Sequence, residues 1–262
     1  MSVLVRLAAT VAATTATASA LILLSPSTRC RAAAPSSAAA PSSAADMRKE
    51  YSEQPLLEAD APADPYTLFA AWFDEACAAG AGIEPNAMCL STVNRDTLRP
   101  SARYVLLKGH DDRGFVWYTN YGSRKSNDLA NNQFAALTFW WGDLERSVRI
   151  EGAVEKVSEE ESAAYFYSRP RSSQIGAWSS SQSSEIAGRA ALEVQEAEVE
   201  RRFADAAMIP KPPHWGGFRL VPDNVEFWKG RASRLHDRLV YTKVSDAALM
   251  SKATWKIARL QP

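Results

Sequence analysis

The chain has 262 residues, 46% hydrophobic and 10% aromatic, which is enough for a full-sized core and excludes a disordered or fibrous protein. Basic and acidic side chains balance at 30 each, so the net charge indicates neither a nucleic-acid surface nor an acidic partner, and any anion site must be local. The cysteines Cys30, Cys77 and Cys89 form no CxxC pair and no ligand-spaced cluster, which argues against a metal site or a disulfide framework and favours a reducing compartment.

Residues 1–46 differ in composition from the rest and are expected to be a targeting or disordered segment. The first 45 residues contain no aspartate or glutamate and only three arginines, among alanine, serine, threonine and leucine. An organelle transit peptide, plastid or mitochondrial, fits this composition better than a secretory signal or an unstructured tail. The longest strongly apolar run, residues 18–24, is far below the roughly 20 residues of a spanning helix, so we expect no membrane anchor. Without such a leader the protein would be cytoplasmic.

The ordered part is expected to be one domain over residues 47–262, beginning with a charged, proline-marked lead-in. Asp64 has the position of a helix N-cap, and Pro65 has that of the first helical residue. The apolar spacing that follows predicts an amphipathic helix, which packs on the core and ends before Gly80.

Short β-rich runs punctuated by turn signals follow from residue 87. Strands are predicted at 87–93, 101–108, 115–121, 134–141 and 147–157, with a short polar helix at 123–132. Strands at hairpin spacing favour an antiparallel barrel or a sharply curled sheet.

Helices and strands both occur in the C-terminal half. Ser158 and Glu161 have the form of a capping box, which opens a helix that must stop at Arg169, before Pro170. A longer helix is predicted at about 184–207. Further strands are predicted at 217–221, 225–228, 235–242 and 255–260. The predicted class is α+β, an antiparallel β-barrel decorated by helices.

The common nucleotide, hydrolase and metalloprotease motifs are missing, namely GxGxxG, the P-loop, GxSxG and HExxH. Cations in short β contexts stand out instead. Because side chains alternate along a strand, Arg103 and Lys108 are expected on opposite faces, serving different ligands or different parts of one. The alternative is that both lie in solvent at the edge of the sheet.

A second cationic pair opens the predicted helix at 123–132. Ser123 is expected to cap this helix, so that Arg124 and Lys125 lie in its first turn. Basic residues there oppose the helix dipole, and a bound anion would relieve this conflict because the free N–H groups also point at it. The pattern is therefore a candidate phosphate site, with an ordinary helix start as the alternative.

A third group combines a tyrosine, an arginine and a serine. Tyr165, Arg169 and Ser173 are spaced four residues apart, across the end of a helix and into a polar loop. These side chains are natural donors for a phosphate monoester. A polar helix C-terminus, where a cation is favoured anyway, would also explain them.

Residues 234–238 form the most informative pattern. If they are a strand, Arg234, His236 and Arg238 point to one face in a row, while the leucines between them face the barrel. Such a basic row is costly unless it is solvated or faces an anion, so it would line a cleft. A core histidine is the alternative for His236.

The order and spacing of many stretches resemble the pyridoxine/pyridoxamine 5'-phosphate oxidase family over residues 47–262. The similar stretches are MRKEY, RYVLLKG, FVWYTNYGSRKS, VRIEG, YFYSRPRSSQIGAW, SQSS, WGGF, VEFWKGRASRLHDR and ARLQP. The resemblance implies a split β-barrel of the FMN-binding type that forms a homodimer, with FMN at the subunit interface and residues from both chains in each site. It implies no role for nucleic acid or a membrane.

The resemblance also implies the site residues. The expected FMN contacts, whose cations would neutralise the flavin phosphate, are Arg103, Tyr104, Val105, Leu106, Leu107, Lys108, Tyr118, Thr119, Arg124, Lys125, Gln182, Ser183, Trp228 and Arg238. The expected substrate contacts are Lys108, Tyr165, Arg169 and Ser173 at the vitamin phosphate, Arg234 and His236 near the pyridine ring, and Arg48 and Tyr51 in an N-terminal lid. Two positions depart from the family pattern, Ser147 in place of Gln and Ser126 in place of Gly.

The implied reaction is the oxidation of pyridoxamine 5'-phosphate or pyridoxine 5'-phosphate to pyridoxal 5'-phosphate, with FMN as hydride acceptor and O2 as the final oxidant that yields H2O2. Arg234 and His236 are the candidate catalytic residues, Arg234 for orientation and His236 in a role that stays open. The alternatives are a barrel that binds flavin or pyridoxal phosphate without turnover and a flavin reductase that uses a nicotinamide cofactor. The stretches SRPRSSQ and RLHDR disfavour the first, and the small phosphate clamp disfavours the second.

Overall fold

The structure is a computed structural model, and it describes residues 43–47, 49–51, 54–80, 84–244 and 254–262. The chain divides into two units, Met1–Arg48 and Lys49–Pro262. Of the first unit the structure describes only a single 3-10 turn, Ala44–Asp46, and its flanks. Residues 1–42 of the predicted leader and Arg48 therefore lie outside the described residues.

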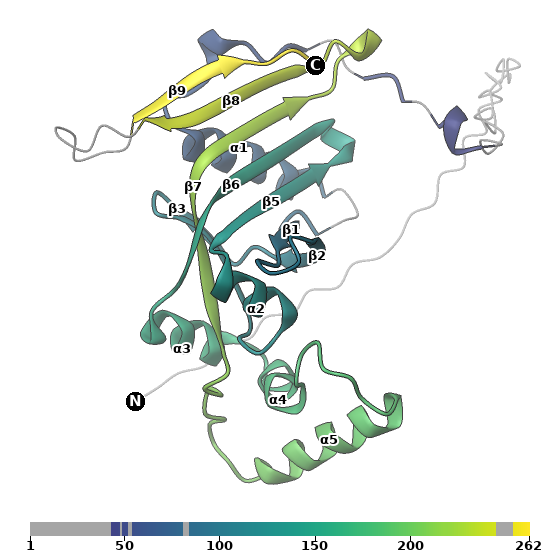
Figure 1. Ribbon diagram of the computed structural model, residues 1–262, viewed down its shortest axis with the longest axis vertical. Helices are drawn as coiled ribbons and strands as arrows, with labels where there is room; N and C mark the ends of the chain where they lie inside the picture. The colour runs from purple at the N-terminus through teal and green to yellow at the C-terminus, as the bar shows by residue number, and fades with distance from the viewer. Residues whose placement is uncertain (1–42, 48, 52–53, 81–83, 245–253) are drawn as a thin grey trace, which may run out of the picture. The chain divides into compact units, whose positions relative to one another are not determined.

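The second unit is built on a nine-stranded antiparallel sheet (Figure 1). Its strands are β1 (Ala87–Val93), β2 (Pro100–Leu106), β3 (Gly109–Asp111), β4 (Gly114–Asn120), β5 (Phe134–Trp141), β6 (Arg146–Lys156), β7 (Trp215–Lys229), β8 (Asp237–Val244) and β9 (Thr254–Arg259). The order is β2-β1-β5-β6-β7-β4-β3, and β8 pairs with both β7 and β9. The curled antiparallel sheet with its helices confirms the predicted α+β class.

The bend of the sheet lies where β6 meets β7. The register shifts between Glu151 and Gly152, and a Cβ on Gly152 would lie 2.1 Å from the carbonyl oxygen of Val221. Only glycine allows this close approach, and such a bulge sharpens the local twist. The extra residue, Asp223, lies in β7 next to Pro222, which pairs with Gly152, so β7 runs through the bulge as one strand where the sequence had predicted two.

Helix α1 (Pro65–Ala78) fills the inside of the curled sheet. Asp64 caps it as predicted, because its carboxylate accepts the Thr67 N–H at 2.9 Å. The ring of Phe69 lies 4.8 Å from that of Phe115 in β4 and 5.2 Å from that of Phe139 in β5, measured between centroids. The helix thus joins strands that are far apart in the sheet order into one core.

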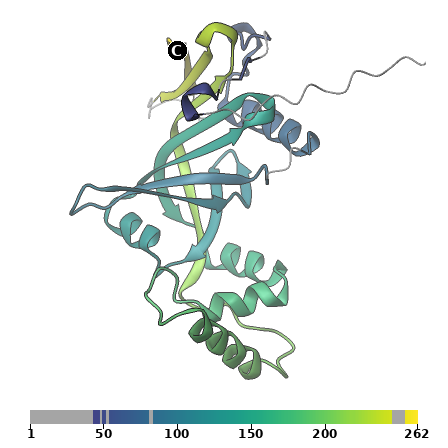
Figure 2. The ribbon, with the colours of Figure 1, turned by 90° about the vertical axis from the view of Figure 1, so that its right-hand side faces the viewer.

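Four further α-helices lie in the described part of the unit, α2 (Arg124–Asn131), α3 (Glu159–Ser168), α4 (Arg171–Ser179) and α5 (Arg189–Arg202). Figures 1 and 2 show α3, α4 and α5 together at one end of the sheet and β8 and β9 at the other. Ser158 caps α3 as predicted. The predicted polar loop after Pro170 is wrong, because Ile175 and Ala177 of α4 are buried in a second core with Phe166. The helix predicted at 184–207 is shorter than expected.

The strand predicted from residue 235 begins only at Asp237. Before it, Ala232–Arg234 form a 3-10 turn in which Ser233 and Arg234 have left-handed φ angles of 56° and 62°. These angles turn the chain, so Arg234, His236 and Arg238 do not form the predicted row on one strand face. No helix in the described ranges is long and apolar enough to cross a membrane.

Replacing Asp64 with alanine is expected to lower the free energy of unfolding by about 1 kcal/mol, because the first turn of α1 loses its N-cap. For a domain of this size this corresponds to a fall in melting temperature of about 2–4 °C. Thermal unfolding followed by circular dichroism measures it. Asp64→Asn keeps an acceptor and should lose much less, whereas equal melting temperatures for wild type and Asp64→Ala would contradict the role of the cap.

Candidate functional site

A cleft of about 760 Å³ lies between β2, β4 and the helices α2, α3 and α4. Most of the predicted cofactor residues and the predicted phosphate donors of the substrate line it together. These lining residues are Arg103, Tyr104, Val105, Leu106, Lys108, Tyr118, Thr119, Arg124, Lys125, Tyr165, Arg169, Ser173, Gln182 and Ser183. Segments almost 80 positions apart in the sequence therefore meet at one hollow.

Two details of the β2 region differ from expectation. Leu107 does not line the cleft, because its side chain is buried in the main core. Arg103 and Lys108 line the same cleft, although strand alternation had predicted opposite faces. The reason is that β2 ends at Leu106, and the Lys108 N–H turns to donate to the carbonyl of Val116 at 2.8 Å.

Lys125 is the buried cation of the cleft. Its Nζ donates to Thr119 Oγ1 and Ser123 Oγ, each at 3.1 Å, and to Gln182 Oε1 at 2.9 Å. Burial, and to a lesser extent the charge of Arg103, lower the pKa of the Lys125 amine to about 8. Ser123 stands at the N-cap position of α2, but its hydroxyl bonds Lys125 and Ser126 and not a helix N–H, so the predicted side-chain cap is wrong.

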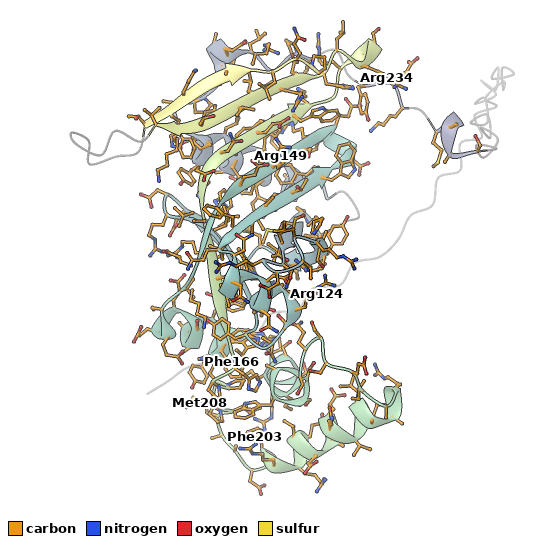
Figure 3. The ribbon with its side chains drawn as sticks, in the orientation of Figure 1. Arg124, Arg149, Phe166, Phe203, Met208 and Arg234 are labelled. Carbon is orange, nitrogen blue, oxygen red and sulfur yellow. The ribbon has the colours of Figure 1, made fainter. Side chains whose placement is uncertain are left out.

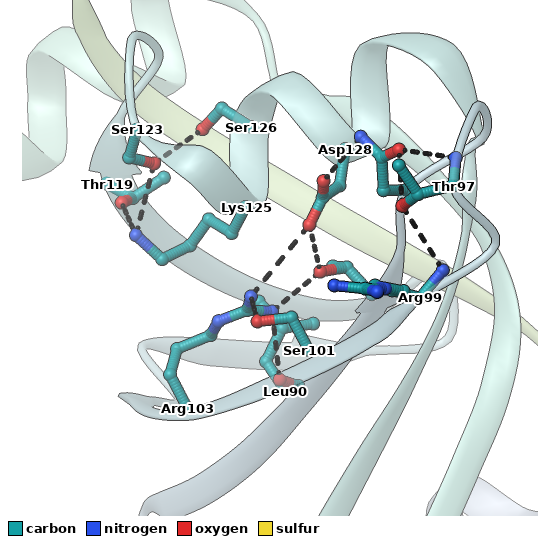
Figure 4. Close-up of polar contacts among 12 residues, drawn as sticks. Leu90, Thr97, Arg99, Ser101, Arg103, Thr119, Ser123, Lys125, Ser126 and Asp128 are labelled. Carbon is teal, nitrogen blue, oxygen red and sulfur yellow. Dashed lines mark hydrogen bonds and ion pairs between the residues drawn. The ribbon is translucent and has the colours of Figure 1, made fainter. Parts of the chain in front are cut away.

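Arg103 is held from three sides, as Figure 4 shows. Its Nη1 donates to Leu90 O at 3.2 Å and to Thr92 Oγ1 at 2.7 Å, and its Nη2 donates to Ser101 Oγ at 2.8 Å. Burial lowers the pKa of this guanidinium, while the carboxylate of Asp128 raises it. The sequence reading missed Thr92 and Asp128, although Asp128 stands four positions after Arg124 on the same helix.

Arg169 occupies another part of the cleft wall, at the C-terminal end of α3. Its guanidinium lies 4.8 Å above the ring of Trp215, and burial lowers its pKa. Its buried Nη1 has no hydrogen-bond partner among the described residues. Tyr165 stacks on Tyr118 beside it, with ring centroids 4.0 Å apart. A buried donor without an acceptor needs an explanation, and a bound anion would provide one.

Ser173 lies in the first turn of α4 and so lines the cleft from a helix and not from a loop. The N–H groups of such a turn favour an anion. Trp215 also lines the cleft and was not predicted, although it opens the WGGF stretch. The described part of the chain contains no cluster of His, Cys, Asp and Glu suited to a metal ion.

A second group of predicted residues lies outside this cleft. His236 contacts Trp228 and Tyr51, with ring centroids 4.7 Å and 5.5 Å away, and Arg238 donates to Glu226 Oε1 at 2.7 Å. Figure 3 shows Arg234 at the upper end of the sheet, well above Arg124. We call Tyr51, Trp228, Arg234, His236 and Arg238 the β8 group.

The His236 ring is oriented by the backbone. Its Nδ1 accepts the N–H of Arg231 at 3.1 Å, which closes the turn before β8. Because Nδ1 is the acceptor, Nε2 carries the proton of the neutral ring and is left as a donor. Tyr51 packs edge-on against the same ring, with planes at 87°.

Ser147 stands between two tryptophans. It pairs with Trp140 across the β5–β6 ladder and with Trp228 across the β6–β7 ladder, so the three side chains share one face. Its hydroxyl donates to Phe139 O at 2.9 Å, and the two indole centroids are 5.8 Å apart. A longer side chain at this position would have to share that space with both indoles.

Comparison with known proteins gives two family-model matches. Residues 73–203 match the model described as pyridoxamine 5'-phosphate oxidase, and residues 215–262 match the C-terminal dimerisation region of pyridoxine 5'-phosphate oxidase. Among curated relatives, pyridoxine/pyridoxamine 5'-phosphate oxidases of Burkholderia lata and Burkholderia cenocepacia are 56% and 58% identical over 218 residues. These matches cover 83% of this chain and 98% of each relative.

Solved structures agree with the sequence matches. PhzG from Burkholderia lata, in complex with tetrahydrophenazine-1-carboxylic acid, is 31% identical with a TM-score of 0.72, over 80% of this chain and 99% of its own. A pyridoxamine 5'-phosphate oxidase-related, FMN-binding protein from Nostoc punctiforme is 14% identical with a TM-score of 0.58, over 76% and 98%, and shows that the split-barrel fold is shared. The chain therefore belongs to the pyridoxamine 5'-phosphate oxidase family of oxidoreductases.

Proposed function

We propose that this protein oxidises pyridoxamine 5'-phosphate and pyridoxine 5'-phosphate to pyridoxal 5'-phosphate, with FMN as hydride acceptor and O2 as the final oxidant that is released as H2O2. One observation carries the proposal. The cleft holds two separate sets of anion donors, one around Lys125 and one around Arg169 with its unpartnered Nη1. Two phosphate-bearing molecules side by side would satisfy both sets, and the names of the curated relatives support a phosphorylated vitamer as one of them.

The residues present fit FMN. Arg103, Arg124 and Lys125 would hold its phosphate, because they bring three cations to one side of the cleft and Lys125 is buried there without a carboxylate among its hydrogen-bond partners. Gln182 and Thr119 would hold the Lys125 amine in position through their hydrogen bonds. When bound, the flavin supplies the two-electron redox chemistry.

Tyr165, Arg169 and Ser173 would bind the phosphate of the substrate. Arg169 is held in place by its contact with Trp215, so its free N–H can point into the cleft without reorganisation. The nearby first turn of α4 adds a favourable dipole. Fixing the phosphate orients the rest of a small substrate, which raises the rate by positioning.

The β8 group would complete the site from a second protomer. It does not line the cleft of its own chain, and Trp228, Arg234, His236 and Arg238 fall within the region matched to a dimerisation model. In a homodimer, Arg234 would orient the pyridine ring and the Nε2–H of His236 would donate to it. Tyr51 would cover the ring as part of the N-terminal lid.

The overall reaction is tested with residues 47–262, flavin and either vitamer under air. The proposal expects a yellow protein that forms pyridoxal 5'-phosphate and H2O2 in equal amounts, because the folded unit carries the whole site. Anaerobic mixing distinguishes the alternatives, since NADPH would bleach a flavin reductase, and tetrahydrophenazine-1-carboxylic acid is the probe for an enzyme that acts on the ligand of PhzG. Bleaching by neither vitamer would overturn the proposal.

The same preparation tests the leader. We propose that residues 1–46 are a targeting segment that activity does not need. The curated relatives named above are bacterial and lend no support to an organelle address. A truncated chain that fails to fold would contradict this role.

Replacing Arg234 with alanine is expected to lower turnover by at least about tenfold while the flavin stays bound, because Arg234 is assigned to the substrate and not to the phosphate of FMN. The absorbance spectrum of the purified variant and its steady-state kinetics measure both effects. His236→Ala should behave alike. A colourless Arg234→Ala protein would contradict the assignment.

Flavin affinity is expected to fall with rising pH because of Lys125. In the flavin-free protein its amine is mostly charged at pH 7 and only about one-tenth charged one unit above a pKa of about 8, so the dissociation constant should rise roughly tenfold near pH 9. Arginine side chains in general stay charged over this pH range. Quenching of flavin fluorescence measures the profile. Lys125→Arg should flatten it, and identical profiles for the two proteins would contradict the role of the amine.

A further inference from the structure

Asp128 is a buried carboxylate beside the cations of the cleft. It lies on α2, three positions after Lys125, and is only 2% exposed. Its Oδ2 accepts the hydroxyl of Thr92 at 2.8 Å and lies 3.9 Å from Arg103 Nη2. Asn94 Nδ2 approaches its other oxygen at 3.5 Å. A buried carboxylate is costly unless it is paired, and here the pairing is with a residue of the cleft.

The hydroxyl of Thr92 connects this carboxylate to Arg103. Thr92 is 1% exposed, so water cannot take over its contacts. Its single proton goes to Asp128, which leaves its oxygen lone pairs to accept Arg103 Nη1 at 2.7 Å. Asp128 therefore fixes the direction of the Thr92 hydroxyl, and the hydroxyl fixes the guanidinium.

The donors of Arg103 divide between protein and cleft. Both hydrogens of Nη1 and one of Nη2 are used by Leu90 O, Thr92 Oγ1 and Ser101 Oγ. A guanidinium has five donors, and Nη2, besides its bond to Ser101, lies 3.9 Å from Asp128 Oδ2. Within the part of the chain that the structure describes, Nε–H therefore remains for a ligand. The contacts of the other donors fix the direction in which Nε–H points, as an anion site with little reorganisation requires.

The geometry points to Asp128, acting through Thr92, as the positioning residue that preorganises Arg103 for the flavin phosphate. This inference rests on the proposed function, since it takes FMN as the ligand. The contact joins three elements, with Thr92 on β1, Arg103 on β2 and Asp128 on α2. It thereby holds the strand that carries one cation against the helix that carries Arg124 and Lys125.

The test is a double-mutant cycle on FMN affinity, measured by quenching of flavin fluorescence on addition to flavin-free protein. Thr92→Val keeps the shape and removes the bridging hydroxyl, and it should weaken FMN binding about fivefold, the effect of one lost hydrogen bond. In the Arg103→Ala background the same change should alter affinity less than twofold, because there is no guanidinium left to position. An equal loss in both backgrounds would overturn the inference.

Two further variants separate positioning from general destabilisation. Asp128→Ala should weaken FMN binding about as much as Thr92→Val, whereas Asp128→Asn, which still accepts the Thr92 hydroxyl, should stay within about twofold of wild type. Asp64→Ala is the matched control, since it lowers the melting temperature without contact with the cleft. Loss of FMN affinity in this control, in proportion to the melting temperature, would show that the effects are structural and overturn the inference.

The cycle also keeps the two proposals apart. A wild-type protein that does not bind FMN would reject the proposed function itself. A wild-type protein that binds FMN, with Thr92→Val unchanged in affinity, would reject only the role of Asp128 and Thr92.

Discussion

The close approach of Gly152 to the carbonyl of Val221 bends the sheet, and much of the site depends on that bend. It lets β7 run continuously through two differently directed halves of the sheet. Trp215 at the start of β7 supports Arg169 in the cleft, and Trp228 near its end packs on His236. One strand therefore carries supporting aromatic side chains for both groups of functional residues, which a flat sheet or two separate strands could not align.

The cleft concentrates positive charge that the chain only partly balances. Burial lowers the pKa of Lys125 and that of Arg169, and Arg103 Nη2 lies 3.9 Å from the buried carboxylate of Asp128. Uncompensated positive charge of this kind lowers the stability of the ligand-free protein, and a bound anion raises it again. Ligand binding and folding stability should therefore be coupled. The hydroxyls of Thr92, Thr119 and Ser123 are neutral, and they hold the cations without competing with the ligand for their charge.

Local signals predicted much of the fold. Two strands, 87–93 and 134–141, have the expected bounds, and α1 and α3 have the expected N-caps. Both kinds of signal are local, because side-chain alternation and capping act over a few residues. The many serines of α4 are typical of a loop in the sequence. The segment forms a helix because its apolar residues pack against Phe166, which the local sequence does not show. Proline predicts the end of a strand because it lacks an N–H for the ladder. At the bulge beside Pro222 no ladder hydrogen bond is lost, so the strand continues. The cations of the cleft were already candidates from their sequence context, and the family resemblance added the other cleft residues. The contact of Thr92 with Arg103 and Asp128 depends on strand register and helix placement, which spacing alone does not give.

The left-handed pair Ser233 and Arg234 has a consequence for engineering this protein. A left-handed conformation destabilises residues other than glycine by about 1–3 kcal/mol each. The turn before β8 therefore lowers the stability of the folded protein while it sets the direction of the chain. Selection for heat resistance alone would favour glycine or asparagine at these positions, since both accept a positive φ more easily. At Arg234 such a substitution would remove a side chain that is assigned to the substrate. At Ser233 it would loosen the turn that positions the Arg234 side chain. Screens for robust variants should therefore score activity in every round, because at this turn the two properties pull in opposite directions.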